Sequence, residues 1–386
     1  MRSGETARKT TARGAFAALA VLVLFLPGTA GPLCAGELRL FGNSAPRPRY
    51  AVPVSGSEDA LRLVDLEHAY PWSGGGRLEL GLVAEDPPET PKPPEGAAPE
   101  TVAPPPKKFW NTTTTLWTAA ALLGGVGQAI GAPIKYGTNS WTFTDEKYFQ
   151  YDTYAGGADK ASHFIISSGV SRLLYDIYIE NGQPVEKSFW IAFAATMTAG
   201  IFVETGDAVT VYGWSWQDLS ADFLGALSGL AIHRYGLEDT IGLRVGPAGG
   251  EVPAWASGSS EESLGSSYND EIYTVDVKPG GLVRKLHGNP GISRFFLVSM
   301  AYYTKGFGYQ PPLPSRYQSL GIEVGINFPA ILDELKVPKD KWWGLGLYEF
   351  FNFFRIPYTQ VGTYYNFKTK KWYGPSAPYH YYSTAY

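Results

Sequence analysis

Ionisable side chains with helical spacing occur in a part of the chain that is otherwise apolar. Asp159 and His163 are four residues apart, and Asp218 and Asp222 repeat this spacing further along the sequence. Residues four apart share one face of an α-helix. We therefore expect each pair to project from a single helical face, where a histidine and carboxylates could exchange protons or hold a cation.

A third apolar stretch contributes two further carboxylates, Glu204 and Asp207, which are three residues apart. Small residues accompany the ionisable groups on the same faces, as Gly200 does for Glu204 and Gly225 for Asp222. Because small residues let helix backbones approach closely, these faces are expected to meet at the packed interface. The acidic residues and the histidine would then converge near one end of the helices.

Several carboxylates and a histidine that are buried together need a counter-cation. Lys160 and Arg172 are near enough in sequence to supply one, and a divalent metal such as zinc or manganese is the alternative. The candidate metal ligands are His163, Glu204, Asp207 and Asp222. The full set of candidate ligand-binding residues is Asp159, Lys160, His163, Glu204, Asp207, Asp218 and Asp222.

Structural roles compete with these functional ones. Ser215 and Asp218 fit the spacing of a capping box, and Asp159 follows two glycines and could cap its helix. His163 alone could be a hydrogen-bonded core residue. Glu204 and Asp207 are harder to explain structurally, since a helix C-terminus disfavours negative charge.

The catalytic candidates are His163, Glu204 and Asp207. In a hydrolase of an envelope lipid or glycan, His163 would act as a base or metal ligand with one of the two acids as its partner. The sequence contains no serine nucleophile elbow, zinc-protease motif, phosphate-binding loop or dinucleotide fingerprint. Whether the protein is an enzyme therefore stays open.

The elements that must position these residues are Gly/Ala-rich helices. Apolar patterning predicts them over Leu116–Ile130, Ala161–Ile179, Ser188–Val203 and Leu219–His233. Beyond Gly236 the pattern becomes that of strands, most clearly at 319–328, where apolar and polar residues alternate. Similar strands are expected over Ile272–Val277, Ser293–Tyr303, Leu345–Phe354 and Thr359–Phe367.

The fold class predicted is α+β, with a compact bundle of about four helices followed by an antiparallel β-sheet region. The sheet could pack on the helices or face a membrane, as outer-membrane strands do. The expected segments are a signal peptide at 1–35, a short strand-like segment at 36–85, a Pro-rich disordered linker at 86–108, the helical core at 109–236 and the β region at 237–386.

The N-terminus has the pattern of an export signal. Basic residues precede an apolar run over Ala15–Leu26, and cleavage after Ala30 or Ala35 would satisfy the small-residue requirement. An uncleaved anchor is the alternative. Cys34 is the only cysteine among 386 residues, and Leu33 before it makes a poor lipidation site.

Composition narrows the partners. The net charge of −4 and the absence of a basic stripe argue against nucleic acid. The 25 tyrosines and 11 tryptophans suit a membrane interface, although they also suit ordinary sheets. A membrane or envelope lipid is the expected partner, and a protein partner is left open.

Four runs between roughly residues 140 and 235 carry a resemblance to a known family: 145–149 (DEKYF), 154–163 (YAGGADKASH), 204–207 (ETGD) and 212–225 (YGWSWQDLSADFLG). Together they resemble DUF2279, a family of predicted periplasmic lipoproteins of unknown function. Their spacing is more distantly similar to that of the VanZ-like membrane family, in which an asparagine often stands where this chain has Asp222.

The resemblance implies export to the periplasm or outer membrane of a Gram-negative bacterium. It implies no established biochemical activity. The chain departs from the pattern in its poor lipidation site and in the additional carboxylate of Asp222, which favours a cation site.

Overall fold

The structure is a computed structural model that describes residues 108–247, 268, 271–307, 316–339 and 341–376. The expected signal peptide, Cys34, the strand-like segment and nearly all of the Pro-rich linker lie outside the described residues. The described part combines seven α-helices with an antiparallel sheet, so the α+β class is confirmed.

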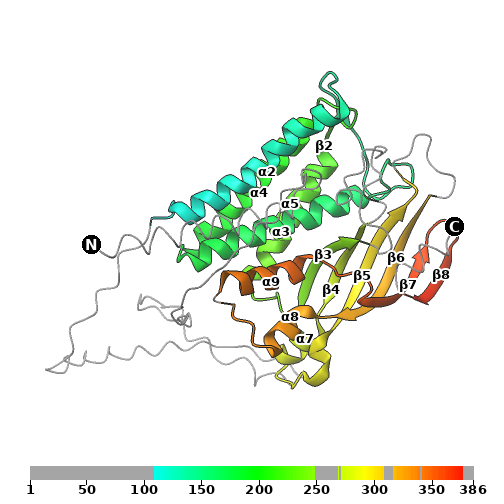
Figure 1. Cartoon of the computed structure of the whole chain (residues 1–386). Coiled ribbons are helices and arrows are strands. Elements are labelled where there is room, and N and C mark those ends of the chain that lie inside the picture. Colours follow the sequence, from blue (N-terminus) through cyan, green and yellow to red (C-terminus); the bar gives the residue numbers. More distant parts are fainter. Residues whose placement is uncertain (1–107, 248–267, 269–270, 308–315, 340, 377–386) are drawn as a thin grey trace, which may run out of the picture. The chain divides into compact units, whose positions relative to one another are not determined.

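Four of the helices are long, and each overlaps a helix expected from the sequence (Figure 1). They are α2 (Thr112–Tyr136), α3 (Ala158–Glu180), α4 (Val185–Asp207) and α5 (Trp216–Arg234). The side chain of Asn111 starts α2 by accepting hydrogen bonds from the N–H groups of Thr113 and Thr114, at 3.0 and 3.1 Å.

The helices pack closely in two pairs, α2 with α4 and α3 with α5. Glycine makes both contacts close. A β-carbon added to Gly125 of α2 would overlap the backbone at Ala199, and one added to Gly225 of α5 would overlap the carbonyl oxygen of Phe164. The small residues seen in the sequence therefore mark packed helix interfaces.

Two of these helices, α2 and α4, are long and apolar enough to cross a membrane by length and composition. Only 17% and 33% of their most apolar stretches are buried. The exposed residues include Leu123, Ile130 and Ile134 of α2 and Trp190 of α4. These helices thus present more apolar surface than helices in the core of a water-soluble domain.

Short backbone pairings place the segment before α3 against the start of α5. Strand β1 (Phe143–Thr144) pairs in parallel with β2 (Trp214–Ser215). The chain then turns into α3 at Gly157, whose φ of 90° is one that glycine adopts readily. A β-carbon there would overlap Phe149.

A six-stranded antiparallel sheet follows α5, with its strands in sequence order. They are β3 (Ile241–Pro247), β4 (Glu271–Val277), β5 (Phe296–Lys305), β6 (Tyr317–Ile326), β7 (Gln360–Asn366) and β8 (Lys371–Ser376). The shorter elements between them are α7 (Pro279–Lys285), the 3₁₀ helix η3 (Gly291–Phe295), α8 (Phe328–Glu334) and α9 (Trp342–Phe353). The strand patterns at 272–277, 293–303, 319–328 and 359–367 correspond to β4, β5, β6 and β7, whereas β3 and β8 were not anticipated.

The expected strand over Leu345–Phe354 is wrong, because residues 342–353 form helix α9. Its buried residues form two pairs four residues apart, Gly344 with Tyr348 and Glu349 with Phe353, a spacing that suits a helix and not a strand. The Glu349 side chain then reaches Arg172 of α3, with Nη2 and Oε2 2.8 Å apart. The helical period was not visible in the sequence, because nearly every position of this segment is apolar.

The sheet and the helices share a core. Ala158 and Ile165 of α3 pack with Val245 of β3, Tyr273 of β4 and Phe353 of α9. The first half of α3 is therefore fixed on both sides, by α5 and by the sheet. This half carries the Asp159 and His163 pair, so the ionisable groups have a rigid base.

Close packing makes a testable prediction about two helical glycines. Gly225→Ala should destabilise the protein by about 1–3 kcal/mol, because the added methyl group overlaps α3. Gly127→Ala is the control, since nothing lies within 4 Å of a β-carbon there, and it should stabilise by roughly 0.5–1 kcal/mol. Urea unfolding monitored by circular dichroism would measure both changes. Equal effects of the two substitutions would contradict the packing argument.

Candidate functional site

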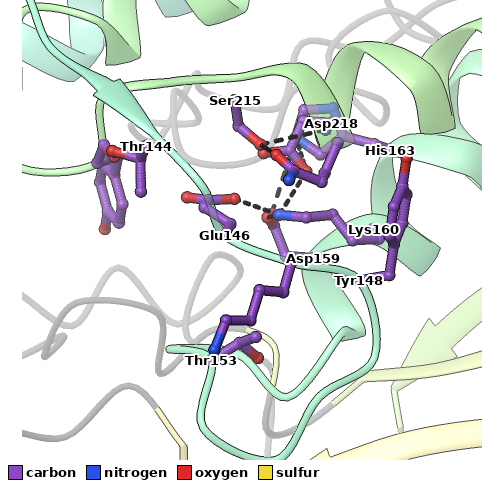
Figure 2. A network of polar contacts seen from close by, with 12 residues as sticks. Thr144, Glu146, Tyr148, Thr153, Asp159, Lys160, His163, Ser215 and Asp218 are labelled. Atoms are coloured by element: carbon purple, nitrogen blue, oxygen red, sulfur yellow. Dashed lines mark hydrogen bonds and ion pairs between the residues drawn. The ribbon is translucent and has the colours of Figure 1, made fainter.

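The ammonium group of Lys160 lies at the centre of a buried cluster of carboxylates (Figure 2). Its Nζ is 2.7 Å from Asp159 Oδ2 and 2.7 Å from Asp218 Oδ1, and it also contacts Glu146 Oε2. All four side chains are at most 6% exposed. Of the two cations expected to balance the acids, Lys160 takes this role, while Arg172 pairs with Glu349.

Three separate segments contribute to this cluster. Asp159 and Lys160 come from the first turn of α3, and Asp218 from the first turn of α5. Glu146 lies two residues beyond β1, and the pairing of β1 with β2 brings it opposite α5. Glu146 was missed among the candidates because it is in a loop, where helical spacing gives no indication.

The capping interpretations turn out differently for the two aspartates. Ser215 does cap α5, since its hydroxyl accepts a hydrogen bond from the N–H of Asp218 at 3.2 Å. The carboxylate of Asp218 is directed to Lys160 instead of completing a capping box. Asp159 is no cap, because the N-cap residue of α3 is Gly157 and no side chain makes a capping hydrogen bond there. Both carboxylates are therefore available to the cluster.

His163 is the second cationic group beside these acids. Its Nδ1 lies 3.2 Å from Oδ1 of Asp222, which also accepts a hydrogen bond of 2.6 Å from the Ser167 hydroxyl. Gly200 of α4 makes room for this carboxylate, because a β-carbon there would lie 2.6 Å from Asp222 Oδ2. Asp222 thus fixes the orientation of the imidazole ring, as a carboxylate does behind many functional histidines.

The other ring nitrogen of His163 faces the Lys160 cluster. Nε2 is 3.7 Å from Asp159 Oδ1 and 4.0 Å from Asp218 Oδ1. One atom from each of the three residues can be chosen so that all lie within 4.8 Å of one another, a spacing that could hold a metal ion. Within the described part of the chain, Asp159 Oδ1 is buried without a hydrogen bond of regular geometry, and a hydrogen bond from the Tyr268 side chain helps to lower the pKa of this carboxyl group.

Burial and mutual charge shift the acidity of these groups. Burial, reinforced by Asp159 and Asp218, raises the pKa of Glu146 to about 10, so this acid is neutral at pH 7. Burial also opposes ionisation of Asp159, but Lys160 and His163 outweigh it and hold its pKa below the usual value. The pKa of Asp218 is raised, chiefly by burial.

The same surroundings affect the pKa of His163 differently, because a histidine is charged when it is protonated. Burial would lower its pKa, but the carboxylates of Asp222, Asp218 and Asp159 raise it well above 6.5. The imidazole is therefore protonated at neutral pH. About 16% of the side chain remains exposed, which leaves the ring accessible to a small molecule or ion.

Glu204 and Asp207 lie near the cluster but outside the metal-sized group. Glu204 Oε2 accepts a hydrogen bond of 2.9 Å from the backbone N–H of Ser215, and burial raises the pKa of this acid to about 9. The pKa of Asp207 is raised by burial to about 7. The expected difficulty of placing charge at this helix end is thus resolved for Glu204 by protonation.

A cavity of about 450 Å³ adjoins the site. Its wall is built from α2, α3, α4 and α5, together with residues around β3 and the end of α9. His163, Asp159, Asp207, Asp218 and Asp222 line it, as do apolar and small residues such as Leu174 and Gly125. Its size is typical of small-molecule sites, and its polar groups converge on one region.

Fold and site together describe an α+β protein in which a buried histidine–carboxylate centre opens into a mainly apolar cavity. Residues 145–234 match the family model DUF2279, described as a predicted periplasmic lipoprotein. No curated protein and no solved structure matches the chain. The match includes every residue of the cluster, from Glu146 to Asp222, and excludes α2 and the sheet. The family's description supports a place in the cell envelope and export to the periplasm.

The two partly buried histidines, His163 and His233, are expected to titrate in opposite directions. In metal-free protein His163 should have a pKa well above 6.5, whereas burial lowers that of His233 to about 4, although its Nδ1 is 2.9 Å from Asp176. Nuclear magnetic resonance titration of the imidazole signals, assigned with His→Gln variants, would measure both.

The raised pKa of His163 also affects stability. A histidine whose pKa is higher in the folded state stabilises the protein fully below its unfolded value of about 6.5, and this contribution is lost as the pH rises through the folded value. Asp222→Asn should lower the pKa of His163 and weaken the loss of stability at alkaline pH. Similar pKa values for the two histidines would contradict the charge balance described here.

Proposed function

We propose that the helical core of this envelope protein binds a divalent cation between His163, Asp159 and Asp218. The observation that carries the proposal is the metal-sized grouping of His163, Asp159 and Asp218, in which the buried Asp159 Oδ1 faces His163 Nε2 at 3.7 Å. Ligand atoms around a tetrahedral zinc ion are about 3.3 Å apart, so the distances of 3.7 and 4.0 Å from His163 Nε2 would have to shorten by about 0.4 and 0.7 Å. Manganese is the other ion that suits these ligands.

Charge supports a divalent ion. With Glu146 neutral, Asp159, Asp218 and Asp222 are balanced only in part by Lys160 and protonated His163. A divalent ion that displaces the His163 proton would bring the formal charge of the cluster to zero. Asp222 would then stand behind the ligating imidazole, a common arrangement around protein-bound zinc.

This proposal selects among the candidates from the sequence. His163 keeps its place, and Asp159 and Asp218 join it as ligands. Asp222 acts through the ring of His163, while Lys160 neutralises the acids beside the metal. Glu204 and Asp207 are further acids at the site whose direct part in binding stays a prediction. In this interpretation the four long helices act as one bundle around the site.

Zinc titration of chelator-treated full-length protein tests the proposal. We expect one tight site, and His163→Gln should weaken it at least about 100-fold by removing a ligand. His233→Gln is the matched control, because this histidine also faces an aspartate but is not part of the site. Asp222→Asn should weaken binding about 10–100-fold through the ring orientation. Isothermal titration calorimetry would measure each affinity.

The pH dependence provides a second measurement of the same site. Because the metal must displace the His163 proton, its affinity should rise about tenfold per pH unit between pH 5 and the raised pKa of His163. Folded His163→Gln protein with wild-type zinc affinity would overturn the proposal. A thermal melt of each variant separates loss of the site from loss of the fold.

A second candidate function is metal-dependent hydrolysis of an envelope lipid or glycan. The cavity favours it, because three protein ligands leave a position for water on a metal whose surroundings can hold an apolar chain. The same cavity would suit simple binding of a lipid-linked ligand by its polar head. The two functions can be told apart because a hydrolase would convert its ligand to product, whereas a binding protein would not.

Hydrolysis is checked with zinc-loaded protein and chromogenic ester and phosphodiester substrates. A hydrolase should release product at a rate that falls at least about 100-fold in His163→Gln, whereas His233→Gln should retain the wild-type rate. Zinc binding without turnover on either substrate class would favour the binding role. Equal rates in both variants would indicate a contaminant and count against catalysis.

A further inference from the structure

One face of the sheet buries charged groups. Arg355, which follows α9, places Nη2 2.8 Å from each carboxylate oxygen of Glu323 on β6. The hydroxyl of Tyr364 on β7 donates to the same carboxylate at 2.7 Å. Arg355, Glu323 and Tyr364 are at most 1% exposed. This pairing neutralises the charges inside the protein.

A second buried network lies two strands away on the same face. Arg244 of β3 pairs with Asp276 of β4, with Nη2 and Oδ1 3.1 Å apart. The Ser299 hydroxyl of β5 donates to Asp276 at 2.6 Å. The strands therefore direct their polar side chains inward along most of the sheet.

The opposite face is apolar and exposed. The strand register places Val277, Val298, Val324 and Val361 in one row across four strands. Val275, Met300 and Ile322 form the next row. The exposed side chains of this face, 36–56% accessible, are Val275, Val277, Phe296, Val298, Met300, Ile322, Val324, Ile326 and Val361.

This distribution of polar and apolar side chains is the reverse of that in a sheet with one face exposed to water. An antiparallel sheet with one solvated face normally turns its apolar residues inward and its polar residues outward. Strands that face lipid have the opposite arrangement, with apolar residues outward and polar residues within. We propose that the apolar face of β4–β7 lies in the acyl-chain region of a single bilayer leaflet.

The apolar face is short and is bounded at both ends. On β5 the exposed apolar positions run from Phe296 to Met300, which at about 3.4 Å per residue is roughly 14 Å. Beyond Met300 the face is covered, because the Tyr302 hydroxyl donates to the carbonyl of Gly156 beside α3. With its strands along the membrane plane, this face would enter one leaflet while both of its ends stay at the polar surface.

The end of the face away from Tyr302 carries positive charge, which complements an anionic lipid surface. Segment 279–294 leaves β4 after Val277 and returns to β5 at Phe296, and it carries three basic residues and no acidic one. Arg284 and Lys285 contact Asp239, and Arg294 contacts Glu334, so three cations meet two anions. Leu286 and Ile292 are 81% and 75% exposed there. Apolar side chains among basic ones are typical of segments that enter anionic membranes.

Vesicle flotation of the full-length protein tests the proposal in the presence of chelator, which keeps it independent of metal binding. The variant combines Val298→Lys with Val324→Glu. These positions are paired across β5 and β6, so the new charges can attract each other in water and preserve the fold. In lipid they should weaken binding to vesicles of phosphatidylcholine with phosphatidylglycerol at least about tenfold. Vesicles of phosphatidylcholine alone should bind the wild-type protein less tightly.

The matched control is Leu224→Glu with Ser228→Lys on α5, which also replaces an exposed apolar side chain without changing net charge. It should bind vesicles as the wild type does. Any N-terminal anchor and the exposed apolar surfaces of α2 and α4 are common to all variants, so the partition coefficients of the variants are compared. The proposal is overturned if the sheet variant floats like the wild type, or if only the α5 variant is impaired. It is also overturned if sedimentation shows a dimer that the sheet variant alone abolishes, since a second copy would then cover the face.

Discussion

The buried ion cluster around Lys160 determines the arrangement on which the site depends. An ammonium group in the protein interior is strongly destabilising unless carboxylates surround it, and removal of one partner from such a cluster typically costs about 3–5 kcal/mol. Glu146, Asp159 and Asp218 come from a loop and two helices, so the cluster forms only when all three segments are in place. Lys160 therefore links the β1 loop, α3 and α5.

The same cluster also sets the chemistry of His163. Protonation of Glu146 limits the negative charge, and the remaining aspartates keep the imidazole protonated in the absence of a metal. Nε2 thus carries a proton that faces Asp159 and Asp218 at neutral pH, and the proposed metal would compete with this proton for the same two oxygen atoms. In the proposed metal site, one geometry would account for a proton-bound and a metal-bound form, and the pH would decide the balance between them.

Local spacing made much of this predictable from sequence. The i, i+4 pairs at Asp159–His163 and Asp218–Asp222 identified the right faces of α3 and α5, and the small residues identified their packing. Glu146 could not be found in this way, because a loop has no period and its position depends on the β1–β2 pairing. Arg172 pairs with Glu349, 177 residues away, a contact that no local pattern contains. Helix α9 was misassigned because apolar residues at nearly every position fit a helix or a strand.

The start of α3 connects the two regions for which functions are proposed. Asp159 and His163 on this helix belong to the histidine–carboxylate site, while the preceding Gly156 carbonyl receives the Tyr302 hydroxyl at the covered end of the sheet face. If the sheet face lies in a leaflet, this contact places the start of α3 close to the surface of the bilayer. The apolar cavity beside His163 would then lie near the lipid. An amphiphile could keep its apolar chain out of water on its way to the site, which explains why a polar centre and an apolar cavity occur together.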